Sequence, residues 1–294
     1  MTRHDATRVT GPAHPGSDRE LSERLGRATA VLEGDVAEPT APGLGVGVDL
    51  GTAFTVLVAI DGNGEALAGD HRFGSVTRDG VVVDYHGAVR TLKELKEVVE
   101  QRLGQELTTA ASGFPPGVAE SEVRAVVHVL EAAGLECSTL IDEPTAANAV
   151  LGVRDGAVVD VGGGTTGIAV FADGELLATA DEPTGGTQAS LVISGRFGVT
   201  FDEAERWKRD SERQEELGPV LRPVWEKVAT IVAQAIAPYD PPTISLVGGT
   251  SRFPGIADVI AGITGVPTTL PGDPMFVTAL GFAHHDLIAT GASR

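Results

Sequence analysis

Cysteine, basic charge and long apolar runs are what this sequence has least of. Cys137 is the only cysteine, so no disulfide can form within the chain, as is typical of a reducing cytoplasm. Lysine and arginine number 22 against 41 acidic residues, a net charge of −19, which disfavours nucleic acid as a partner. No apolar run is long enough to cross a bilayer, and the polar start MTRHDATRVTGPAHPG is unlike a secretory signal. We therefore expect a cytoplasmic protein with neither a membrane nor a nucleic-acid partner.

The hydrophobic content, in contrast, is sufficient for a large core. At 294 residues and 42% hydrophobic composition, the chain predicts one large domain or two lobes. Residues 1–17 are polar, and residues 18–34, DRELSERLGRATAVLEG, carry apolar side chains at helical spacing before a linker. Two interpretations of this amphipathic helix stay open: it docks on its own domain, or it inserts in a groove of a partner as a targeting helix.

From Leu44 onward, apolar strand-like runs alternate with amphipathic helical segments. The strand-like runs include VGVDL, TVLVAID, AVVDV, GIAVFAD, ELLATAD and TISLVGG. The helical segments include RTLKELKEVVEQRLG, ESEVRAVVHVLEAAG and RPVWEKVATIVAQAIA. This alternation predicts an α/β fold.

One pattern occurs twice. VDLGTAFTVLVAIDGNGEAL, from Val48, is matched by VDVGGGTTGIAVFADGELL, from Val159. In each copy an apolar strand ends at an aspartate, a Gly/Thr turn follows, and a second strand leads to an Asp-Gly turn. The second copy has one more residue in its glycine turn. The repeat predicts two related lobes that each present a β-hairpin to a shared ligand.

The paired turns have the composition of a phosphate-binding site. Glycines allow backbone N–H groups to approach phosphate oxygens, threonines add hydroxyl donors, and two carboxylates can hold a hydrated Mg²⁺. The residues concerned are Gly51, Thr52, Gly162, Gly163, Gly164, Thr165 and Thr166 for phosphate, and Asp49 and Asp160 for Mg²⁺ through water. For one copy alone we would favour an ordinary hairpin with aspartate at a turn position. Two matching copies favour the phosphate site.

A third acidic position lies between the repeats, in STLIDEPTAANAV. Pro144 is suited to the first turn of a helix, and Glu143 just before it is a candidate to orient an attacking water in the cleft. The alternative is that Glu143 merely favours a helix N-terminus.

Two later segments have residues suited to a nucleoside. In TISLVGGTSRFPG, Gly248 and Gly249 permit close approach to a base or ribose, and Arg252 can stack on an adenine. In FDEAERWKRD, Glu205 and Lys208 share a helix face, where they either bond a ribose or base or form a surface ion pair.

Together these segments resemble the nucleotide-binding domain of the actin, Hsp70 and sugar-kinase superfamily. VGVDLGTAFTVLV resembles its first phosphate motif, VVDVGGGTTGIAV its second, and ISLVGGTSRFPG its adenosine motif, while DEPTAANAV and VTALGFA resemble its two connecting helices. AASGFPPG, LEAAGLECSTLIDEPTAANAVL and FDEAERWKRD further resemble the ethanolamine-utilisation protein J (EutJ) family, whose members are described as chaperone-like proteins of bacterial microcompartment systems.

The resemblance implies a two-lobed actin-like ATPase fold with duplicated ribonuclease H-like lobes. It divides the chain into residues 1–42, a tail with a short helix and linker; 43–156, a first lobe; 157–270, a second lobe; and 271–294, a C-terminal helix returning to the first lobe. It implies ATP with Mg²⁺ between the lobes, catalytic positions at Glu143, Asp160 and Asp49, and Gly185, Gly186, Glu205, Lys208, Arg209, Gly248, Gly249 and Arg252 at the nucleoside.

The sequence departs from the superfamily pattern in three ways. First, no early lysine matches the phosphate-facing lysine of Hsp70. Second, only about ten residues, SERQEELGPV, stand where relatives carry an extra subdomain. Third, no peptide-binding domain follows. With these departures, the resemblance implies a microcompartment assembly factor that hydrolyses ATP slowly or not at all. Its expected partners are shell or core proteins, which bind through the N-terminal helix. A non-catalytic scaffold, a reactivating factor for a cobalamin-dependent lyase and a small-molecule kinase remain alternatives, and the oligomeric state stays open.

Overall fold

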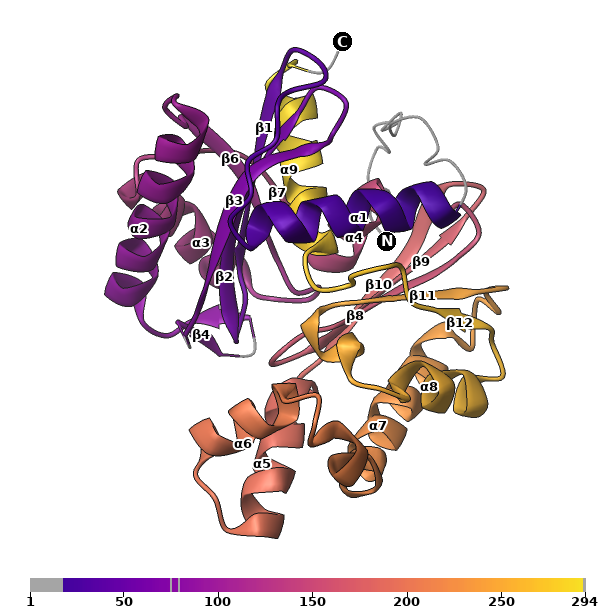
Figure 1. The fold of residues 1–294 in the computed structure, drawn as a ribbon. Helices are drawn as coiled ribbons and strands as arrows, with labels where there is room; N and C mark the ends of the chain where they lie inside the picture. The colour runs from indigo at the N-terminus through magenta and orange to yellow at the C-terminus, as the bar shows by residue number, and fades with distance from the viewer. Residues whose placement is uncertain (1–17, 75, 79, 293–294) are drawn as a thin grey trace.

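Two five-stranded sheets, one in each half of the chain, organise the protein (Figure 1). The computed structural model describes residues 18–74, 76–78 and 80–292. In the described residues no helix is both long and apolar enough to cross a membrane. The fold is a two-lobed α/β structure, as the sequence predicts.

The first lobe is built on the sheet β3-β2-β1-β6-β7. Strands β1, β2 and β3 are antiparallel, whereas β1, β6 and β7 run parallel. Helices and a small hairpin, β4–β5, complete the lobe. The elements are β1 (Leu44–Leu50), β2 (Phe54–Asp61), β3 (Ala66–Phe73), β4 (Thr77–Arg78), β5 (Val81–Val82), α2 (Tyr85–Leu103), β6 (Thr109–Phe114), α3 (Glu120–Ala132) and β7 (Glu136–Asp142).

The second lobe repeats this order as β10-β9-β8-β11-β12. Its first three strands are again an antiparallel meander, and β8, β11 and β12 are parallel. The elements are β8 (Gly156–Val161), β9 (Thr166–Ala172), β10 (Glu175–Glu182), α5 (Gly186–Phe197), α6 (Phe201–Arg209), α7 (Gln214–Ile236), β11 (Ile244–Val247), the short 3₁₀ helix η1 (Gly249–Arg252), α8 (Ile256–Thr264) and β12 (Thr268–Thr269). The shared strand order confirms that the two lobes are related.

Helices α4 (Glu143–Leu151) and α9 (Val277–Ala289) pack against each other between the sheets (Figure 1). A Cβ on Gly281 of α9 would lie 2.0 Å from the carbonyl oxygen of Ala146 in α4, so the two backbones touch. α9 also lies on β1, where a Cβ on Gly47 would meet the Ala279 carbonyl oxygen at 2.1 Å. The glycines therefore bring the C-terminal helix against the first lobe and against the helix that leads into the second.

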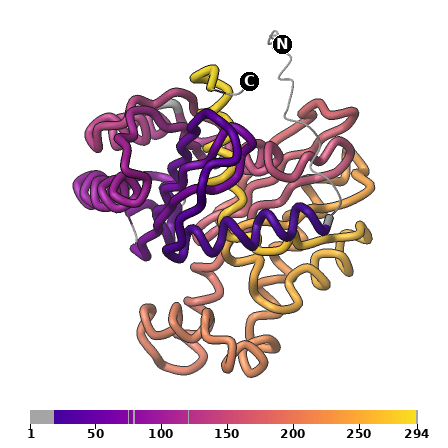
Figure 2. Tube along the Cα trace, turned by 45° about the horizontal axis from the view of Figure 1, so that its top comes forward, coloured from indigo at the N-terminus to yellow at the C-terminus, as the bar shows by residue number. Residues whose placement is uncertain are grey.

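The N-terminal helix α1 (Asp18–Leu32) docks on the body of the protein. Leu25, Ala28, Val31 and Leu32 are 1–3% exposed and share a core with β2 and β3. Figure 2 shows the helix lying along the first lobe and reaching toward the second. Because its apolar stripe is buried on its own chain, the docked interpretation is the one that the structure supports.

Helix α7 begins earlier than the sequence indicates. Most of the segment SERQEELGPV lies inside α7, which starts at Gln214, and only residues 210–213 separate it from α6. Pro219 and Pro223 lie within the helix but face solvent. A proline deprives the carbonyl four residues earlier of its helical partner, and water can replace that partner on an exposed face.

Candidate functional site

A cavity of about 540 Å³ lies between the two lobes. The hairpin turns of both repeats, the start of α4, helix α6 and η1 all contribute to its wall. Of the predicted site residues, these line it: Asp49, Gly51, Thr52, Glu143, Asp160, Gly162, Gly163, Gly164, Thr165, Glu205, Lys208, Arg209, Gly248, Gly249 and Arg252. The fold thus gathers residues from both halves of the chain around one space.

The two turns of the repeat face each other across this cavity. A Cβ on Gly163 would lie 3.1 Å from Ala53 Cβ and 3.2 Å from its backbone nitrogen. A side chain at position 163 would therefore crowd the other hairpin, and the carbonyl oxygen of Gly163 accepts a hydrogen bond from the backbone of Thr187 at 2.8 Å. Within the second turn, the carbonyl oxygen of Gly162 accepts hydrogen bonds from the backbone of Gly186 and, at 2.7 Å, from the hydroxyl of Thr250.

Three carboxylates gather at the inner end of the cavity, and each has a raised pKa. Enclosure by the protein, together with the charge of Asp160, raises the pKa of Asp49 to about 7. The pKa of Glu143 is raised well above its usual range, mainly by burial and secondly by the charge of Asp49. Burial also raises the pKa of Asp160, although its hydrogen bond from Thr278 opposes the rise. The cluster stores electrostatic repulsion that a bound cation would relieve.

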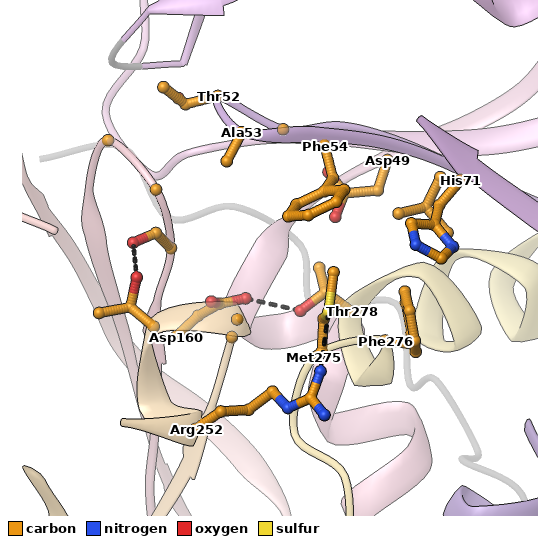
Figure 3. Close-up of a pocket in the computed structure, with 18 of the residues that line it drawn as sticks. Asp49, Thr52, Ala53, Phe54, His71, Asp160, Arg252, Met275, Phe276 and Thr278 are labelled. Atoms are coloured by element: carbon orange, nitrogen blue, oxygen red, sulfur yellow. Dashed lines mark hydrogen bonds between the residues drawn. The ribbon is translucent and has the colours of Figure 1, made fainter. Parts of the chain in front are cut away.

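Thr278 is a site residue that our sequence reasoning missed. Its hydroxyl donates to Oδ2 of Asp160 at 2.6 Å, and both side chains are buried (Figure 3). Thr278 lies in VTALGFA, which the sequence identifies only as a helix that connects the lobes. Nothing local distinguishes a threonine that packs from one that orients a carboxylate, so only its position relative to Asp160 reveals the role.

Glu143 is not the cap of α4. Asp142 is the N-cap, and its side chain accepts a hydrogen bond from the backbone nitrogen of Thr145 at 3.0 Å. Glu143 follows it in the first turn of α4, where an acidic side chain favours the helix N-terminus, and it also lines the cavity. The functional interpretation of Glu143 is consistent with this geometry, in which a carboxylate beside the phosphate turns can accept a proton from water.

Three predicted contacts lie behind the cavity wall rather than on it. Gly185 and Gly186 do not line the cavity: Gly185 packs on the carbonyl oxygens of the second glycine turn, and Gly186 donates its N–H to Gly162. They support the turn that would contact a ligand. The hydroxyl of Thr166 donates to the carbonyl oxygen of Thr184 at 2.6 Å and is buried, so Thr166 is not a free donor for phosphate.

Glu205 and Lys208 form a buried ion pair, not a surface one. The Nζ of Lys208 lies 2.6 Å from Oε1 of Glu205, and the two side chains are 11% and 7% exposed. Lys208 also donates to the Gly186 carbonyl oxygen at 2.8 Å and to Ser190 Oγ, and burial lowers its pKa. The pair ties α6 to α5 and presents only part of its surface to the cavity.

Two arginines line the cavity, Arg209 at the end of α6 and Arg252 at the end of η1. The guanidinium of Arg209 stacks over the ring of Phe73, 4.3 Å from its centroid, and lies near Phe54. The Nη1 of Arg252 lies 3.5 Å from the sulfur of Met275 (Figure 3). Arg209 thus reaches from α6 to strands of the first lobe, with its guanidinium stacked on an aromatic ring of that lobe.

Aromatic residues that the sequence analysis did not single out form another wall. Phe54, His71 and Phe276 line the cavity, and their neighbouring ring centroids lie 5.3–5.5 Å apart (Figure 3). His71 also bonds the carbonyl oxygen of Leu32, at the end of α1. The docked N-terminal helix therefore supports one side of the site.

The donor set is suited to a cation that keeps its water. Among the described residues, no group of three or more His, Cys, Asp and Glu side chains is placed to hold a metal ion directly. Mg²⁺ needs few protein carboxylates and retains several waters, and Asp49 and Asp160 face the same space from the two hairpins. The residues present therefore fit hydrated Mg²⁺ better than a metal held by the protein alone.

Comparisons with known proteins agree with this fold and identify close relatives. Ethanolamine utilization protein EutJ of Salmonella typhimurium is 39% identical over 265 residues, which cover 90% of this chain and 93% of the relative. The crystal structure of EutJ from Carboxydothermus hydrogenoformans superposes with a TM-score of 0.86 at 45% identity, covering 92% of this chain and 99% of the other.

More distant matches cover parts of the same fold. Residues 157–281 match the family described as Cell division protein FtsA, and residues 74–195 match MreB/Mbl protein. MreB5 of Spiroplasma citri bound to AMPPNP has a TM-score of 0.65 at 18% identity, over 83% of this chain and 95% of its own. The chaperone protein HscA homolog of Chromobacterium violaceum is 28% identical over 71% of this chain, which spans 42% of that relative.

Proposed function

The chain belongs to the EutJ family of ethanolamine utilization proteins, and from that premise and the cleft geometry we propose that it is a nucleotide-switched assembly factor. In this proposal Mg·ATP binds between the lobes, draws them together and changes the surface offered to a partner. The observation that carries it is the meeting of two glycine turns and three carboxylates of raised pKa in one cavity.

The phosphate end of the cavity supports a Mg²⁺-bound triphosphate. Backbone N–H groups of the two glycine turns and the hydroxyls of Thr52 and Thr165 supply hydrogen-bond donors for phosphate oxygens. The carboxylates of Asp49 and Asp160 would repel a bare anion, so we propose that they hold Mg²⁺ through water. When bound, Mg²⁺ would neutralise charge on the phosphates and polarise the terminal phosphoryl group.

The outer end supports a nucleoside. Arg209 and Arg252 offer planar faces, Gly248 and Gly249 leave room for close approach, and the Glu205–Lys208 pair presents polar atoms. We propose that adenine stacks between the two arginines and that Arg209 leaves Phe73 for the base. MreB5, of the same fold, has been solved with AMPPNP.

Hydrolysis in this site would be slow. The described cations that line the cavity are Lys208, Arg209 and Arg252, and each is assigned above to the nucleoside end. Lys208 is moreover held by Glu205, Ser190 and the Gly186 carbonyl oxygen. No described Lys or Arg among the lining residues is then left to stabilise the charge on the phosphoryl group during transfer. Such electrostatic stabilisation is the largest catalytic contribution in sites of this kind. We propose a weak ATPase in which Glu143 orients the water.

The chaperone-like part of the proposal concerns partners. We propose microcompartment shell or core proteins as partners, and microcompartment association within the cytoplasm as the location. Because the apolar stripe of α1 is buried, contact through this helix would use its exposed face, where Arg19 and Glu23 lie. A scaffold that keeps the fold without catalysis is the second candidate. It is favoured over a fast enzyme because no described Lys or Arg is assigned to the phosphate end of the cavity.

Calorimetric titration with Mg·ATP tests the proposal. The wild type should bind saturably, and Asp160→Ala should lose binding, because the substitution removes one carboxylate from the Mg²⁺ site. Asp202→Ala, an exposed position in the first turn of α6, is the matched control and should bind as the wild type does. Absence of binding at millimolar Mg·ATP would overturn the switch and leave the scaffold.

A further inference from the structure

One carboxylate links the N-terminal helix to an arginine of the cavity. The hydroxyl of Thr29, on α1, donates to Oδ2 of Asp273 at 3.1 Å. The other carboxylate oxygen, Oδ1, lies 3.7 Å from Nε of Arg252 and accepts a hydrogen bond from the backbone nitrogen of Met275 at 3.1 Å. Arg252 and Met275 line the cavity, whereas Asp273 and Thr29 do not. Asp273 thus stands behind the cavity wall and connects α1 with Arg252.

Arg252 is the member of this group that would gain from being held. Its side chain is 52% exposed, whereas that of Asp273 is 14% exposed. An exposed arginine samples many rotamers, and that freedom is lost when its guanidinium stacks on a ligand. In the ligand-free protein the guanidinium already has partners at two atoms, Asp273 at Nε and the sulfur of Met275, 3.5 Å away, at Nη1 (Figure 3). The N–H groups of a guanidinium lie at its edge and stacking uses its faces, so these contacts are compatible with a base stacked on Arg252.

The segment that carries Asp273 is fixed between α1 and the glycine turn after β11. A Cβ on Gly272 would lie 3.2 Å from both Cα and the carbonyl oxygen of Ser22, so the segment touches the backbone of α1. On its other side, the carbonyl oxygen of Pro274 accepts a hydrogen bond from the backbone nitrogen of Gly248 at 2.9 Å. Helix η1 follows Gly248 directly. These contacts fix the backbone that carries Asp273.

Thr29 differs from two arginines of α1 in where its hydrogen bond goes. Arg24 donates to the carbonyl oxygen of Gly64, in the turn between β2 and β3. Arg27 donates to the carboxylate of Glu65 at 2.9 Å, in the same turn of the first lobe. The hydrogen bond of Thr29 instead reaches the segment between β12 and α9. Helix α1 therefore connects the first lobe with the segment that contacts an arginine of the cavity.

The hydroxyl of Thr29 has one proton and two acceptors within reach. The carbonyl oxygen of Leu25 lies 3.0 Å away, one helical turn earlier, as is common for threonine in a helix. An ionised carboxylate, such as that of Asp273, is a stronger acceptor than a neutral carbonyl group. The bond to Asp273 is thus the one whose loss should matter most when the hydroxyl is removed.

We propose that Asp273 is a positioning residue for the nucleoside and that Thr29 makes its effect depend on α1, an inference that rests on the proposed function. Asp273 holds Arg252 in the orientation in which it stacks on the base, without touching the nucleotide itself. Less side-chain freedom is then lost when the nucleotide binds. Thr29 in turn holds the carboxylate of Asp273. Docking of α1 therefore contributes to the affinity for nucleotide.

A double-mutant cycle tests the role of Asp273. Calorimetry measures the affinity for Mg·ATP of the wild type, Asp273→Asn, Arg252→Ala and the double variant. Asp273→Asn keeps the shape of the side chain and removes its charge, so it should weaken binding about threefold or more. Arg252→Ala should itself bind less tightly, and in that background Asp273→Asn should change the affinity by less than about 1.5-fold. A purely structural effect acts in both backgrounds, so equal losses in the two would overturn the role of Asp273.

A second series tests the link to α1. Thr29→Val keeps the shape, removes the hydroxyl and should weaken binding of Mg·ATP about twofold or more, whereas Thr29→Ser should restore the affinity. Arg19→Ala, on the exposed face of the same helix, is the control and should bind as the wild type does. If Asp273→Asn is poorly folded by its melting temperature, a cycle of Thr29→Val with Arg252→Ala provides the same comparison. Wild-type affinity in Thr29→Val would overturn the link to α1.

The possible outcomes separate this inference from the proposed function. The wild type may bind Mg·ATP and lose it with Asp160→Ala, while Arg252→Ala or Asp273→Asn binds as tightly as the wild type. That result would overturn the positioning role and leave nucleotide binding between the lobes intact. Failure of the wild type to bind millimolar Mg·ATP would overturn both.

Discussion

Thr278 on α9 donates its hydroxyl to Oδ2 of Asp160 at 2.6 Å, and this contact joins the two lobes. α9 packs on β1 of the first lobe, whereas Asp160 ends the apolar run of β8 in the second. Helix α9, which packs on the first lobe, thereby orients the carboxylate of Asp160 in the second lobe. The contact links the position of the lobes to the electrostatics of the proposed Mg²⁺ site.

Replacing Thr278 with valine should weaken Mg·ATP binding. The variant keeps the side-chain shape but removes the donor, so the carboxylate of Asp160 becomes less well oriented and its pKa rises further. A hydrogen bond to a charged group contributes about 1.5–3 kcal/mol. This bond is already present without ligand, so that range is the upper limit of its effect, and we expect a loss of affinity of roughly tenfold in calorimetry. Thr278→Ser is the control and should retain most of the affinity. Equal affinities for all three proteins would contradict the role given to this contact.

The contribution of Asp49 to the stability of the ligand-free protein should fall as the pH rises from about 4 to 7. Asp49, whose pKa is raised from 3.8 to about 7, holds a proton in the folded state that the unfolded chain releases in this range. The folded state binds more protons there, so unfolding becomes easier as the pH increases. Asp49→Asn removes this titration, and its melting temperature should exceed that of wild type by a margin that grows with pH. Parallel melting curves across the range would mean that Asp49 titrates normally.

Gly163→Ala should impair nucleotide binding, whereas Gly195→Ala should not. The new Cβ at position 163 would press on Ala53 and Thr52 of the opposite hairpin, and overpacking of this kind costs about 1–3 kcal/mol. A Cβ at position 195, on α5, meets nothing within 4 Å, and alanine in a helix is favoured over glycine by roughly 0.5–1 kcal/mol. Affinity for Mg·ATP should therefore fall only in the first variant, and the stability of the second should rise. Unchanged affinity in Gly163→Ala would show that the turns need not approach.

Leu25→Ala should destabilise the whole protein if α1 stays docked in solution. Leu25 is 2% exposed in the core shared by α1, β2 and β3, and a buried leucine truncated to alanine costs about 2–5 kcal/mol. Chemical denaturation measures the change. Arg19→Ala, on the exposed face of the same helix, is the control and should shift the free energy of unfolding by no more than about 0.5 kcal/mol. A neutral Leu25→Ala would mean that the helix is free of the body.

The sequence by itself determined the two-lobed fold and most of the proposed site. Strand periodicity, an aspartate at the end of a strand and a glycine turn are local features, and their repetition identified both hairpins. The structure brings Asp49, Asp160 and Glu143 to one cavity as that pattern predicts. The carboxyl ends of the parallel strands β1 and β7 share an edge of the first sheet, which gathers Asp49 and Glu143, whereas Asp160 comes from β8 of the other lobe.

Tertiary structure alone decided which polar groups are committed and which are free. It pairs Thr278 with Asp160, and it engages the ammonium of Lys208 in hydrogen bonds to three acceptors. It also places Gly185 and Gly186 behind the turn and leaves the hydroxyl of Thr77 without a described partner. It also docked α1 and extended α7 through two prolines. These outcomes depend on residues distant in the chain, because a hydrogen-bond partner or a buried face is supplied by packing and not by the spacing of neighbours.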